Sequence, residues 1–370
     1  MERLRTGVIG VGAIAQMMHL PYLRELSGHF EIAALCDVDP VALETIGRQY
    51  GVSRLFTSAD DLLQEPLDLV MILSSGDHAA VTIAALERGR HVFVEKPLAY
   101  TLRETDEVLS AAKRSGKTLM VGMMKQYDPG YQRGLDIVRT LNDLRYVDAT
   151  TLQPENTLYM FHYPIARQSG WPPAITETYG EEMYRAAQTG ILGHEPVPLL
   201  EEGSGSSDPD VLTAYFFLIA SSIHDVNALR GALGQPERVI SAHLWAAGTS
   251  FTAVLAYPNE VRATYVWSLL PYLKHYTETF SFHASDGRVM IRFPSPYLRN
   301  APTMVDIERM HGEELQVTRL TASYEEAFKR ELLELDDCIR TGRTPRTDGP
   351  GFRQDLEVLI EIAKSFPGSA

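Results

Sequence analysis

The chain has 370 residues, of which 45% are hydrophobic and 22% charged, so it is long enough for two globular domains with sizeable cores. Its formal net charge is −14 and it has no lysine- or arginine-rich cluster, which argues against nucleic acid or an anionic membrane surface as a partner. The two cysteines, Cys36 and Cys338, are far apart in the sequence, so they build neither a disulfide framework nor a thiolate metal site.

A strand-like run begins almost at the N-terminus, so no signal peptide is expected. The longest apolar stretch, 215–223, is too short to span a bilayer. The expected location is therefore a reducing, cytoplasmic compartment.

The first 122 residues alternate between strand-like and helix-like segments. Strands are expected at 5–10, 31–36, 68–73, 91–94 and 118–122. Helices are expected at 14–26, 79–88 and 103–115, with Gly89 and Gly116 at helix C-caps. This alternation predicts βαβ units and a doubly wound parallel sheet of the Rossmann type.

A glycine loop follows the first strand and matches the pattern Gly-x-Gly-x-x-Ala, formed by Gly10, Gly12 and Ala15. The first glycine permits a tight turn, and the second lets a pyrophosphate approach the backbone. The third small residue permits close helix–strand packing. Ala13, Ile14 and Ala15 open the next helix, whose first amides are available to phosphate. The loop predicts a dinucleotide site.

Asp37 ends the second strand, about 20 residues after the glycines, where an acid can bond the ribose hydroxyls. An acid at this place disfavours the extra phosphate of NADP, so NAD is the expected cofactor and NADP the less favoured one. The alternative interpretation is a helix cap for the segment from Pro40 onward, and both roles can coexist.

Glu95 and Lys96 close the apolar run 91–94, and Pro97 follows them. Ligands in open α/β sheets bind beyond the carboxyl ends of the strands, and buried charges are costly unless paired or functional. A lysine there can exchange protons near neutral pH. The alternative is a surface salt bridge after a strand.

From about residue 144 the pattern becomes that of an antiparallel sheet. Runs with strand character lie at 144–153, 237–247, 250–257, 260–268, 276–284, 287–293 and 304–310. Pro258-Asn259 and Asp286-Gly287 are turn signals, and the second predicts a hairpin. We expect helices on one face of this sheet and an uncovered, apolar face that meets a second subunit.

An insert at 154–209 precedes a mostly apolar, buried helix at 209–232. Within the insert we expect a helix at 178–189 and a polar loop at 201–207. Near the C-terminus, Ser323 and Glu326 have the spacing of a capping box, and further helices are expected over 323–366. The predicted domains are 1–124, a dinucleotide-binding domain, and 125–370, an α+β domain for substrate binding and oligomerisation with a large, open-faced, mostly antiparallel sheet.

Together these features resemble the Gfo/Idh/MocA family of oxidoreductases. The resemblance covers nearly all of the first domain, including the glycine loop, Ala34 to Asp37, and the run Ala84 to Pro97 with His78 ahead of it. In the second domain it is thinner, covering the helix with His224, the Asp286-Gly287 hairpin and the C-terminal helix with Arg340.

The resemblance implies that Lys96 lies between nicotinamide and substrate, that Glu95 orients it, and that His224 is the second catalytic group. It also implies that Ser74, Ser75 and His78 belong to the cofactor loop. For His224 alone, the alternative is a hydrogen-bonded histidine of the core.

Three residues depart from the family pattern. Ala220 stands where many members have an Asp one helical turn before the histidine, and Asn227 stands where an acid is common. Ser74 replaces the proline expected at the end of the third strand. The first two departures leave the substrate class open, while Ser74 reshapes the cofactor loop.

Further polar residues are candidates for substrate contact by type. They are Lys125, Tyr127, His162, Tyr179 and His275. Each has a structural alternative. The spacing of the histidines fits no compact ligand motif, so no metal is expected.

The sequence thus predicts an NAD(P)-dependent oxidoreductase that transfers hydride between nicotinamide and a secondary alcohol of a sugar, glycoside or cyclitol. Two alternatives remain: a glycoside hydrolase or lyase that oxidises a sugar carbon transiently, and a non-catalytic, cofactor-binding regulator. The expected partners are a small carbohydrate or cyclitol and further copies of the chain, as a homodimer or homotetramer.

Overall fold

The structure is a computed structural model that describes residues 2–155, 157–167 and 181–367. The chain forms two compact units. The first comprises Met1–Met123, Tyr163–Glu177 and Phe328–Arg353, and the second comprises Met124–His162, Thr178–Ala327 and Gln354–Ala370. The chain therefore returns to the first unit after the second has begun.

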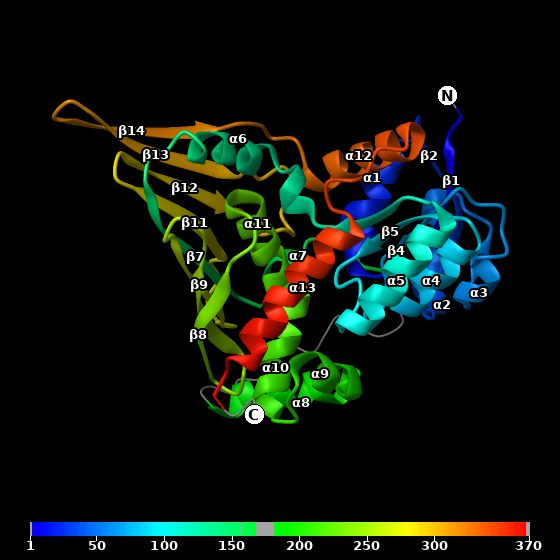
Figure 1. Ribbon diagram of the computed structural model, residues 1–370. Helices are drawn as coiled ribbons and strands as arrows, with labels where there is room; N and C mark the ends of the chain where they lie inside the picture. Colours follow the sequence, from blue (N-terminus) through cyan, green and yellow to red (C-terminus); the bar gives the residue numbers. More distant parts are fainter. Residues whose placement is uncertain (1, 156, 168–180, 368–370) are drawn as a thin grey trace. The chain divides into compact units, whose positions relative to one another are not determined.

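The first unit is built on a six-stranded parallel sheet with the order β3-β2-β1-β4-β5-β6 (Figure 1). The strands are β1 (Leu4–Ile9), β2 (Phe30–Cys36), β3 (Leu55–Phe56), β4 (Leu69–Ile72), β5 (His91–Glu95) and β6 (Leu119–Gly122). This order reverses direction between β1 and β4, as in Rossmann folds, and confirms the predicted fold. The two-residue β3 was not predicted, because it is too short to show a pattern.

Helices flank this sheet and begin and end where the sequence indicates. They are α1 (Leu20–Glu25), α2 (Pro40–Tyr50), α3 (Ala59–Leu62), α4 (Ala79–Glu87), α5 (Leu102–Ser115) and α12 (Ala327–Thr341), with a π-helical turn η1 (Ala15–His19) before α1. Thr101 and Glu104 form a capping box at the start of α5, and Gly116 ends that helix in the left-handed conformation.

The second unit is built on an eight-stranded sheet with the order β14-β13-β12-β11-β7-β10-β9-β8. The strands are β7 (Leu144–Gln153), β8 (Arg238–Trp245), β9 (Ser250–Ala256), β10 (Arg262–Leu269), β11 (Thr277–Ala284), β12 (Gly287–Phe293), β13 (Met304–His311) and β14 (Glu314–Thr321). Only the β7–β10 pair is parallel, so the predicted mostly antiparallel sheet is confirmed, as is the β11–β12 hairpin at Asp286-Gly287.

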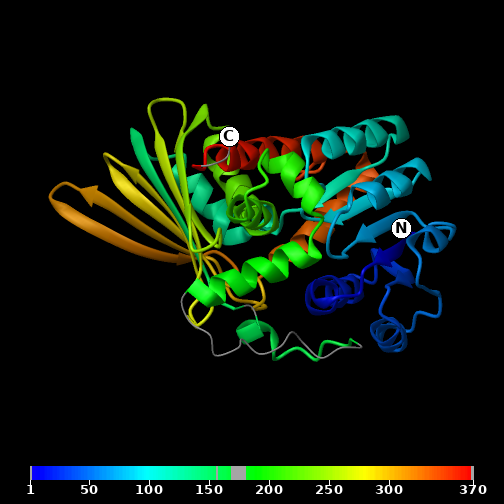
Figure 2. The same cartoon turned by 90° about the horizontal axis from the view of Figure 1, so that it is seen from below.

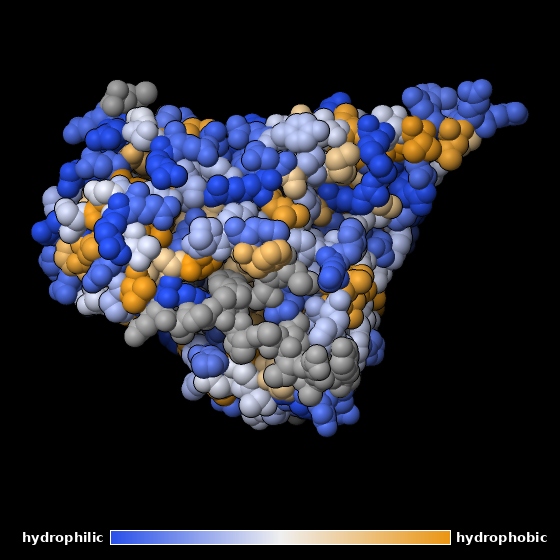
Figure 3. Space-filling model, turned by 180° about the vertical axis from the view of Figure 1, so that it is seen from behind, coloured by the Kyte–Doolittle hydropathy of each residue, from blue (hydrophilic) through white to orange (hydrophobic). Residues whose placement is uncertain are grey.

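The edge strand β14 was not predicted. Its side chains are exposed at nearly every position, so it lacks the alternation that a half-buried strand displays. The β13–β14 hairpin exposes Met310, Leu315 and Val317, and Figure 3 shows apolar side chains among charged ones at this projecting end.

One face of this sheet carries the helices of the second unit (Figures 1 and 2). The elements of this unit are η2 (Met124–Tyr127), α6 (Pro129–Val138), α7 (Thr157–Met160), α8 (Glu181–His194), α9 (Val197–Ser204), α10 (Pro209–Phe217), η3 (Leu218–Ser222) and α11 (Ile223–Leu233), and most of α13 (Gly349–Lys364) also belongs to it. The apolar run from α10 through α11 is 72% buried over its most apolar window, which is the packing of a core helix.

The sheet is open on one face as predicted, but its aromatic side chains are divided between the two faces. Phe251 and Trp267 lie on the covered face, are at most 1% exposed, and stack with ring centroids 5.5 Å apart. The opposite face carries polar residues at the alternating positions, among them Asp148, Thr150, Thr264, Thr279 and Arg292. Strand alternation sends Phe251 and Trp267 toward the helices, whereas Trp245 is 46% exposed and Tyr146 is 37% exposed. The homo-oligomer stays a prediction.

Two local predictions are also wrong. The predicted loop 201–207 is helical up to Ser204, because Gly203 allows close packing: a Cβ there would lie 2.4 Å from the Tyr215 hydroxyl. The capping box at Ser323 and Glu326 does not form. The Ser323 hydroxyl accepts from the Glu325 amide, and Glu326 binds the Asn300 amide.

Candidate functional site

The glycine loop joins β1 to the helix that follows, and its first glycine is required by backbone geometry. Gly10 has φ of +90°, and a Cβ there would lie 2.3 Å from the Ser74 nitrogen. The Gly10 amide donates to the Cys36 carbonyl at 2.8 Å. The loops after β1 and β4 are therefore held against each other at the carboxyl edge of the sheet.

Gly12 has open space where its Cβ would be, with no atom within 4 Å, and the residue is exposed. Ala13 and Ile14 are already helical and lead into Ala15 at the start of η1. The first amides of a helix have no partner within the helix, and they face an anion favourably. An accessible backbone beside a helix N-terminus fits the pyrophosphate of a dinucleotide.

Asp37 is half-exposed and oriented by two backbone amides. Its Oδ2 accepts from Val11 at 2.7 Å, and its Oδ1 accepts from Asp39 at 2.8 Å. The helix cap is Asp39, whose side chain accepts from the amides of Val41 and Ala42. Asp39 therefore caps the helix, and the Asp37 carboxylate is fixed beside the glycine loop by the Val11 and Asp39 amides.

His78 ties the loop after β4 to the loop after β5. Its ring is buried, with Nε2 at 2.8 Å from the Ser74 carbonyl oxygen and Nδ1 at 2.8 Å from the Pro97 carbonyl oxygen. Ser74 is half-buried and Ser75 is exposed. The histidine thus shapes the edge of the site through backbone contacts.

Glu95 is buried, while Lys96 is half-buried at the carboxyl end of β5. Glu95 Oε2 accepts from the Lys96 backbone amide at 3.2 Å, and Oε1 lies 2.7 Å from Nε2 of His19. Burial alone would raise the pKa of the Glu95 carboxyl, but His19 and Lys96 hold it below its usual value. Glu95 is thus a buried carboxylate paired with a histidine, not half of a surface salt bridge.

His19 was missed in the sequence, although one signal was present. It is the only ionisable residue in the apolar run Met17 to Leu20, and a polar side chain within such a run requires a partner. Gln16, three residues earlier, holds a segment of the insert. Its side chain accepts from the Ala166 amide and donates to the carbonyls of Ala166 and Val11.

In the second unit, His224 lies half-buried on α11, and its neighbour Asp225 turns toward the sheet. Asp225 binds the Lys125 ammonium at 2.6 Å and accepts from the hydroxyls of Thr151 and Tyr265 at 2.9 and 2.7 Å. Glu278 also pairs with Lys125. Lys125, predicted as a substrate contact, is therefore buried in an ion cluster, where burial lowers its pKa while Asp225 opposes the shift.

Asn227 also has a structural use. Its Oδ1 accepts from Gln126 at 2.9 Å, and its Nδ2 donates to Asp355 Oδ2 at 2.7 Å. Arg230 binds the same carboxylate at 2.6 and 3.0 Å. The amide both accepts from Gln126 and donates to Asp355, whereas an ionised acid would repel Asp355. The departure at Asn227 thus follows from packing against α13.

The remaining predicted contacts differ in their exposure to solvent. Tyr127 is buried. His162 is exposed with its ring 3.9 Å from that of Phe161, and His275 is exposed. Tyr179 lies outside the described residues. Within the described ranges, no three or more His, Cys, Asp or Glu side chains gather as a metal site would require.

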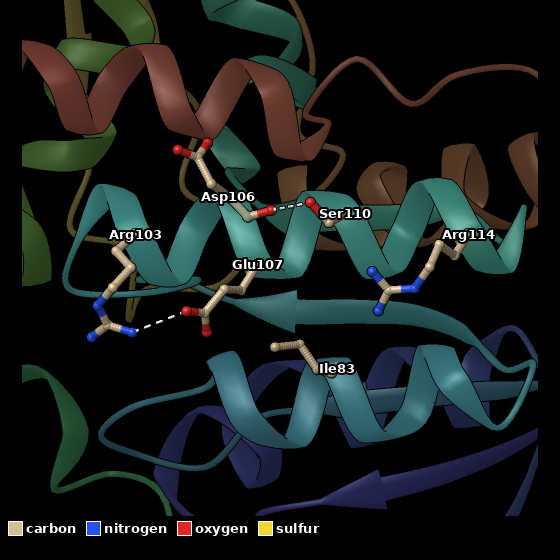
Figure 4. Close-up of a pocket in the computed structure, with 6 residues that line it drawn as sticks. All are labelled: Ile83, Arg103, Asp106, Glu107, Ser110 and Arg114. Carbon is tan, nitrogen blue, oxygen red and sulfur yellow. Dashed lines mark hydrogen bonds and ion pairs between the residues drawn. The ribbon is translucent and has the colours of Figure 1, made fainter.

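A hollow of about 590 Å³ lies between α4 and α5, away from the carboxyl edge of the sheet (Figure 4). Its charged side chains are paired, Arg103 with Glu107 and Arg114 with Glu87, each at 3.1 Å. Figure 4 shows Arg103, Glu107 and Arg114 along the surface of α5, so the hollow is a solvated groove rather than part of the site.

The comparisons agree with this geometry. The profile of the Gfo/Idh/MocA oxidoreductases, described as an oxidoreductase family with an NAD-binding Rossmann fold, matches residues 4–123. The uncharacterized oxidoreductase YrbE of Bacillus subtilis is 30% identical over 252 residues, which are 64% of this chain and 71% of YrbE. The chain belongs to the Gfo/Idh/MocA family of oxidoreductases.

Other curated relatives match over a shorter stretch. An inositol 2-dehydrogenase/D-chiro-inositol 3-dehydrogenase of Halalkalibacterium halodurans is 37% identical over 137 residues, covering 35% of this chain and 38% of that protein. The inositol 2-dehydrogenase of Salmonella typhimurium is 31% identical, covering 36% of this chain and 41% of that protein. The chain thus spans about two-fifths of the length of these dehydrogenases.

Solved structures share the fold along the whole chain. KijD10, a 3-ketoreductase from Actinomadura kijaniata solved with NADP and TDP-benzene, has a TM-score of 0.73 at 18% identity, covering 99% of this chain and 98% of its own. UDP-N-acetylglucosamine 3-dehydrogenase GnnA from Acidithiobacillus ferrooxidans has a TM-score of 0.71 at 19% identity with the same coverage. At this identity the likeness establishes the two-part fold.

Proposed function

We propose that this family member is a dehydrogenase that oxidises or forms a secondary alcohol on a sugar, glycoside or cyclitol, with NAD as its cofactor. One observation carries the proposal. Lys96 lies half-buried beside the buried Glu95 carboxylate, on the same sheet edge as the accessible glycine loop. A lysine beside a buried carboxylate at the edge that carries the glycine loop is suited to proton transfer at a hydroxyl.

When bound, a nicotinamide accepts or supplies the hydride. The chain must then hold or move the hydroxyl proton, and Lys96 is the proposed residue for that step. Its Nζ hydrogen-bonds the substrate oxygen and stabilises the charge that develops there. Glu95 keeps a negative charge behind the lysine, because its carboxylate stays ionised in the buried site.

His224 is the proposed second catalytic residue. It stays half-buried on α11, while Asp225 and Asn227 on the same helix are fully engaged in structural contacts. A neutral imidazole can accept the alcohol proton, and an imidazolium can return it in the reverse reaction.

The proposed substrate class follows the named relatives, which act on cyclitols and on nucleotide-linked sugars. The proposed preference for NAD follows Asp37, whose half-exposed carboxylate would repel a 2′-phosphate. KijD10 was solved with NADP, so the cofactor preference of this chain needs its own measurement.

The test is a panel of sugars, glycosides, nucleotide-linked sugars and cyclitols, each offered with NAD and with NADP. We expect reduced cofactor to accumulate with at least one cyclic polyol, and His224→Ala to slow this reaction. A panel in which product forms without net reduction of the cofactor would replace the proposal with transient sugar oxidation. A panel without turnover would reject the proposed substrate class.

A further inference from the structure

We infer that His19 is a positioning residue that acts on Lys96 through Glu95. The inference deepens the proposed function and rests on it. The three residues form a chain of contacts inside the first unit: His19 Nε2 lies 2.7 Å from Glu95 Oε1, and Glu95 Oε2 accepts from the Lys96 amide at 3.2 Å.

The ring of His19 is fixed more firmly than a surface histidine would be. It has no solvent exposure, and the rings of Phe93 and Phe328 meet it edge-on with centroids 5.2 and 5.5 Å away. Because a carboxylate only accepts, Nε2 carries the proton of the bond to Glu95. No residue in the described part of the chain forms a hydrogen bond with His19 Nδ1. The contact of Nε2 with Glu95 is therefore the hydrogen bond that the buried ring makes.

His19 ends the π-helical turn η1, which begins at Ala15, the last residue of the glycine loop. A π-turn inserts one residue into a helix, changes the direction of the side chains that follow, and often occurs at functional sites. One short element thus presents backbone to the dinucleotide site and a histidine to the carboxylate behind Lys96.

Glu95 is also confined by its other neighbours. Gly122 faces it on β6, where a Cβ would lie 3.2 Å from both Cδ and Oε2 of Glu95. That distance is tighter than ordinary van der Waals contact, so a side chain at Gly122 would displace the carboxylate. The glycine therefore provides space for the carboxylate rather than flexibility.

A second buried carboxyl lies near this group. Glu331 on α12 has no solvent exposure, and its Oε1 accepts from the Met123 amide at 2.8 Å. Burial and the charge of Glu95 raise the pKa of Glu331 well above its usual value, which favours the neutral form of its carboxyl. The titratable and charged groups that face Glu95 are then His19 from η1, Lys96 after β5 and Glu331 from α12.

The arrangement makes His19 the donor that keeps Glu95 ionised and oriented in a site that would otherwise protonate it. Without that donor, burial raises the pKa of Glu95, and the carboxylate moves or takes up a proton. Lys96 then loses the fixed negative charge beside it. A misplacement of about 1 Å in such a group costs on the order of 10²-fold in rate.

The experiment compares His19→Leu, which removes the donor, with His19→Gln, whose amide nitrogen replaces Nε2. With the substrate found in the panel, His19→Leu should lower kcat about 10- to 100-fold and move the acid limb of the pH–rate profile to higher pH. His19→Gln should restore most of kcat. In both variants the Kd for NAD should change less than about twofold, because the glycine loop is untouched.

Two further readouts separate this inference from a structural role and from the proposed function. In a Glu95→Gln background, His19→Leu should have no additional effect on kcat or on the pH profile. Without any substrate, the melting temperature of His19→Leu should fall as pH rises from 5 to 8, relative to wild type, because Glu95 then ionises at a cost.

The inference is overturned if His19→Leu keeps the wild-type pH dependence of its melting temperature, or if it slows Glu95→Gln as much as it slows wild type. A wild type that turns over no member of the panel rejects the proposed function instead. In that case the melting experiment still decides whether His19 controls Glu95.

Discussion

Two lysines of this chain stand beside buried carboxylates, and their surroundings differ in a way that separates chemistry from structure. Lys125, in the second unit, is buried between Asp225 and Glu278, with the rings of Phe280 and Phe293 within 6.0 Å of its ammonium. Lys96, in the first unit, is half-buried beside one carboxylate whose other oxygen is bound by His19.

The difference in burial separates a structural lysine, Lys125, from a lysine proposed to be catalytic, Lys96. Lys125 is buried and pairs with two carboxylates. These ion pairs join η2, α11 and β11, so the role of Lys125 is structural. Lys96 keeps part of its surface at the edge where the glycine loop ends, and its carboxylate is fixed by other residues. Lys96 therefore keeps part of its surface exposed, whereas Lys125 is buried.

The most direct test of this comparison is to replace each lysine in turn and to measure both activity and stability. Lys96→Ala should lower turnover about 10²- to 10⁴-fold, because the proton-transfer group is lost. The Kd for NAD should stay near that of wild type, since the glycine loop and Asp37 are unchanged. Full turnover by Lys96→Ala would show that the lysine is not catalytic.

Lys125→Met should act on stability instead. Removing the cation leaves the buried carboxylates of Asp225 and Glu278 without their partner, which costs about 3–5 kcal/mol of unfolding free energy. Urea denaturation measures it, and Lys113→Met on the exposed side of α5 is the control, with a change within about 0.5 kcal/mol. If the Lys125→Met protein is as stable as wild type, Lys125 does not stabilise the fold as proposed.

The framework of both units could be predicted from the sequence because it rests on local patterns. Buried parallel strands read as short apolar runs, as in β4, and the antiparallel strands alternate around Asp-Gly and Pro-Asn turns. The glycine loop and Asp37 are likewise local, since their spacing alone indicates a dinucleotide edge. Edge strand β14 was not predicted because its own side chains are exposed at nearly every position.

The supporting residues could not be predicted, because they meet across long sequence separations. His19 and Glu95 are 76 residues apart, and Met123 and Glu331 are 208 apart. Lys125 and Asp225, 100 apart, illustrate the same limit: residue type suggested a sugar contact, while the fold places the ammonium in an ion cluster. Which partner reaches a polar side chain depends on the packing of the whole unit.

A smaller effect should distinguish Asp37 from its neighbour Asp39. Wild type should bind NAD about 10- to 100-fold more tightly than NADP, the equivalent of about 1.5–3 kcal/mol for a charged hydrogen bond. Asp37→Ser should narrow this preference, while Asp39→Ser, which keeps a capping side chain on α2, should preserve it. Titration of both cofactors into the three proteins decides, and equal affinities in wild type would reject the assignment.

The last effect depends on pH and concerns Glu331. Its folded pKa is raised, so the group opposes folding as pH rises above its unfolded value near 4.5, by up to about 1.4 kcal/mol per pH unit until the folded pKa is reached. Glu331→Gln keeps an acceptor for the Met123 amide and removes the titration. Its stability relative to wild type should therefore increase between pH 5 and pH 8.

Glu313→Gln, on the exposed β13–β14 hairpin, is the control for that experiment and should follow the wild-type pH dependence. If Glu331→Gln follows wild type as well, Glu331 is not held neutral in the fold. The proposed electrostatics around Glu95 would then have to include two carboxylates, Glu95 and Glu331.

The central claim is hydride transfer at a secondary alcohol carbon, and isotopic labelling tests it most directly. The substrate from the panel, carrying deuterium at one carbinol carbon at a time, is incubated with NAD, and the released cofactor is weighed by mass spectrometry. The account predicts that one labelled position yields singly deuterated, reduced cofactor in equal amount to the oxidised product. Product that forms while the released cofactor stays oxidised, or deuterium that appears in water, would contradict it.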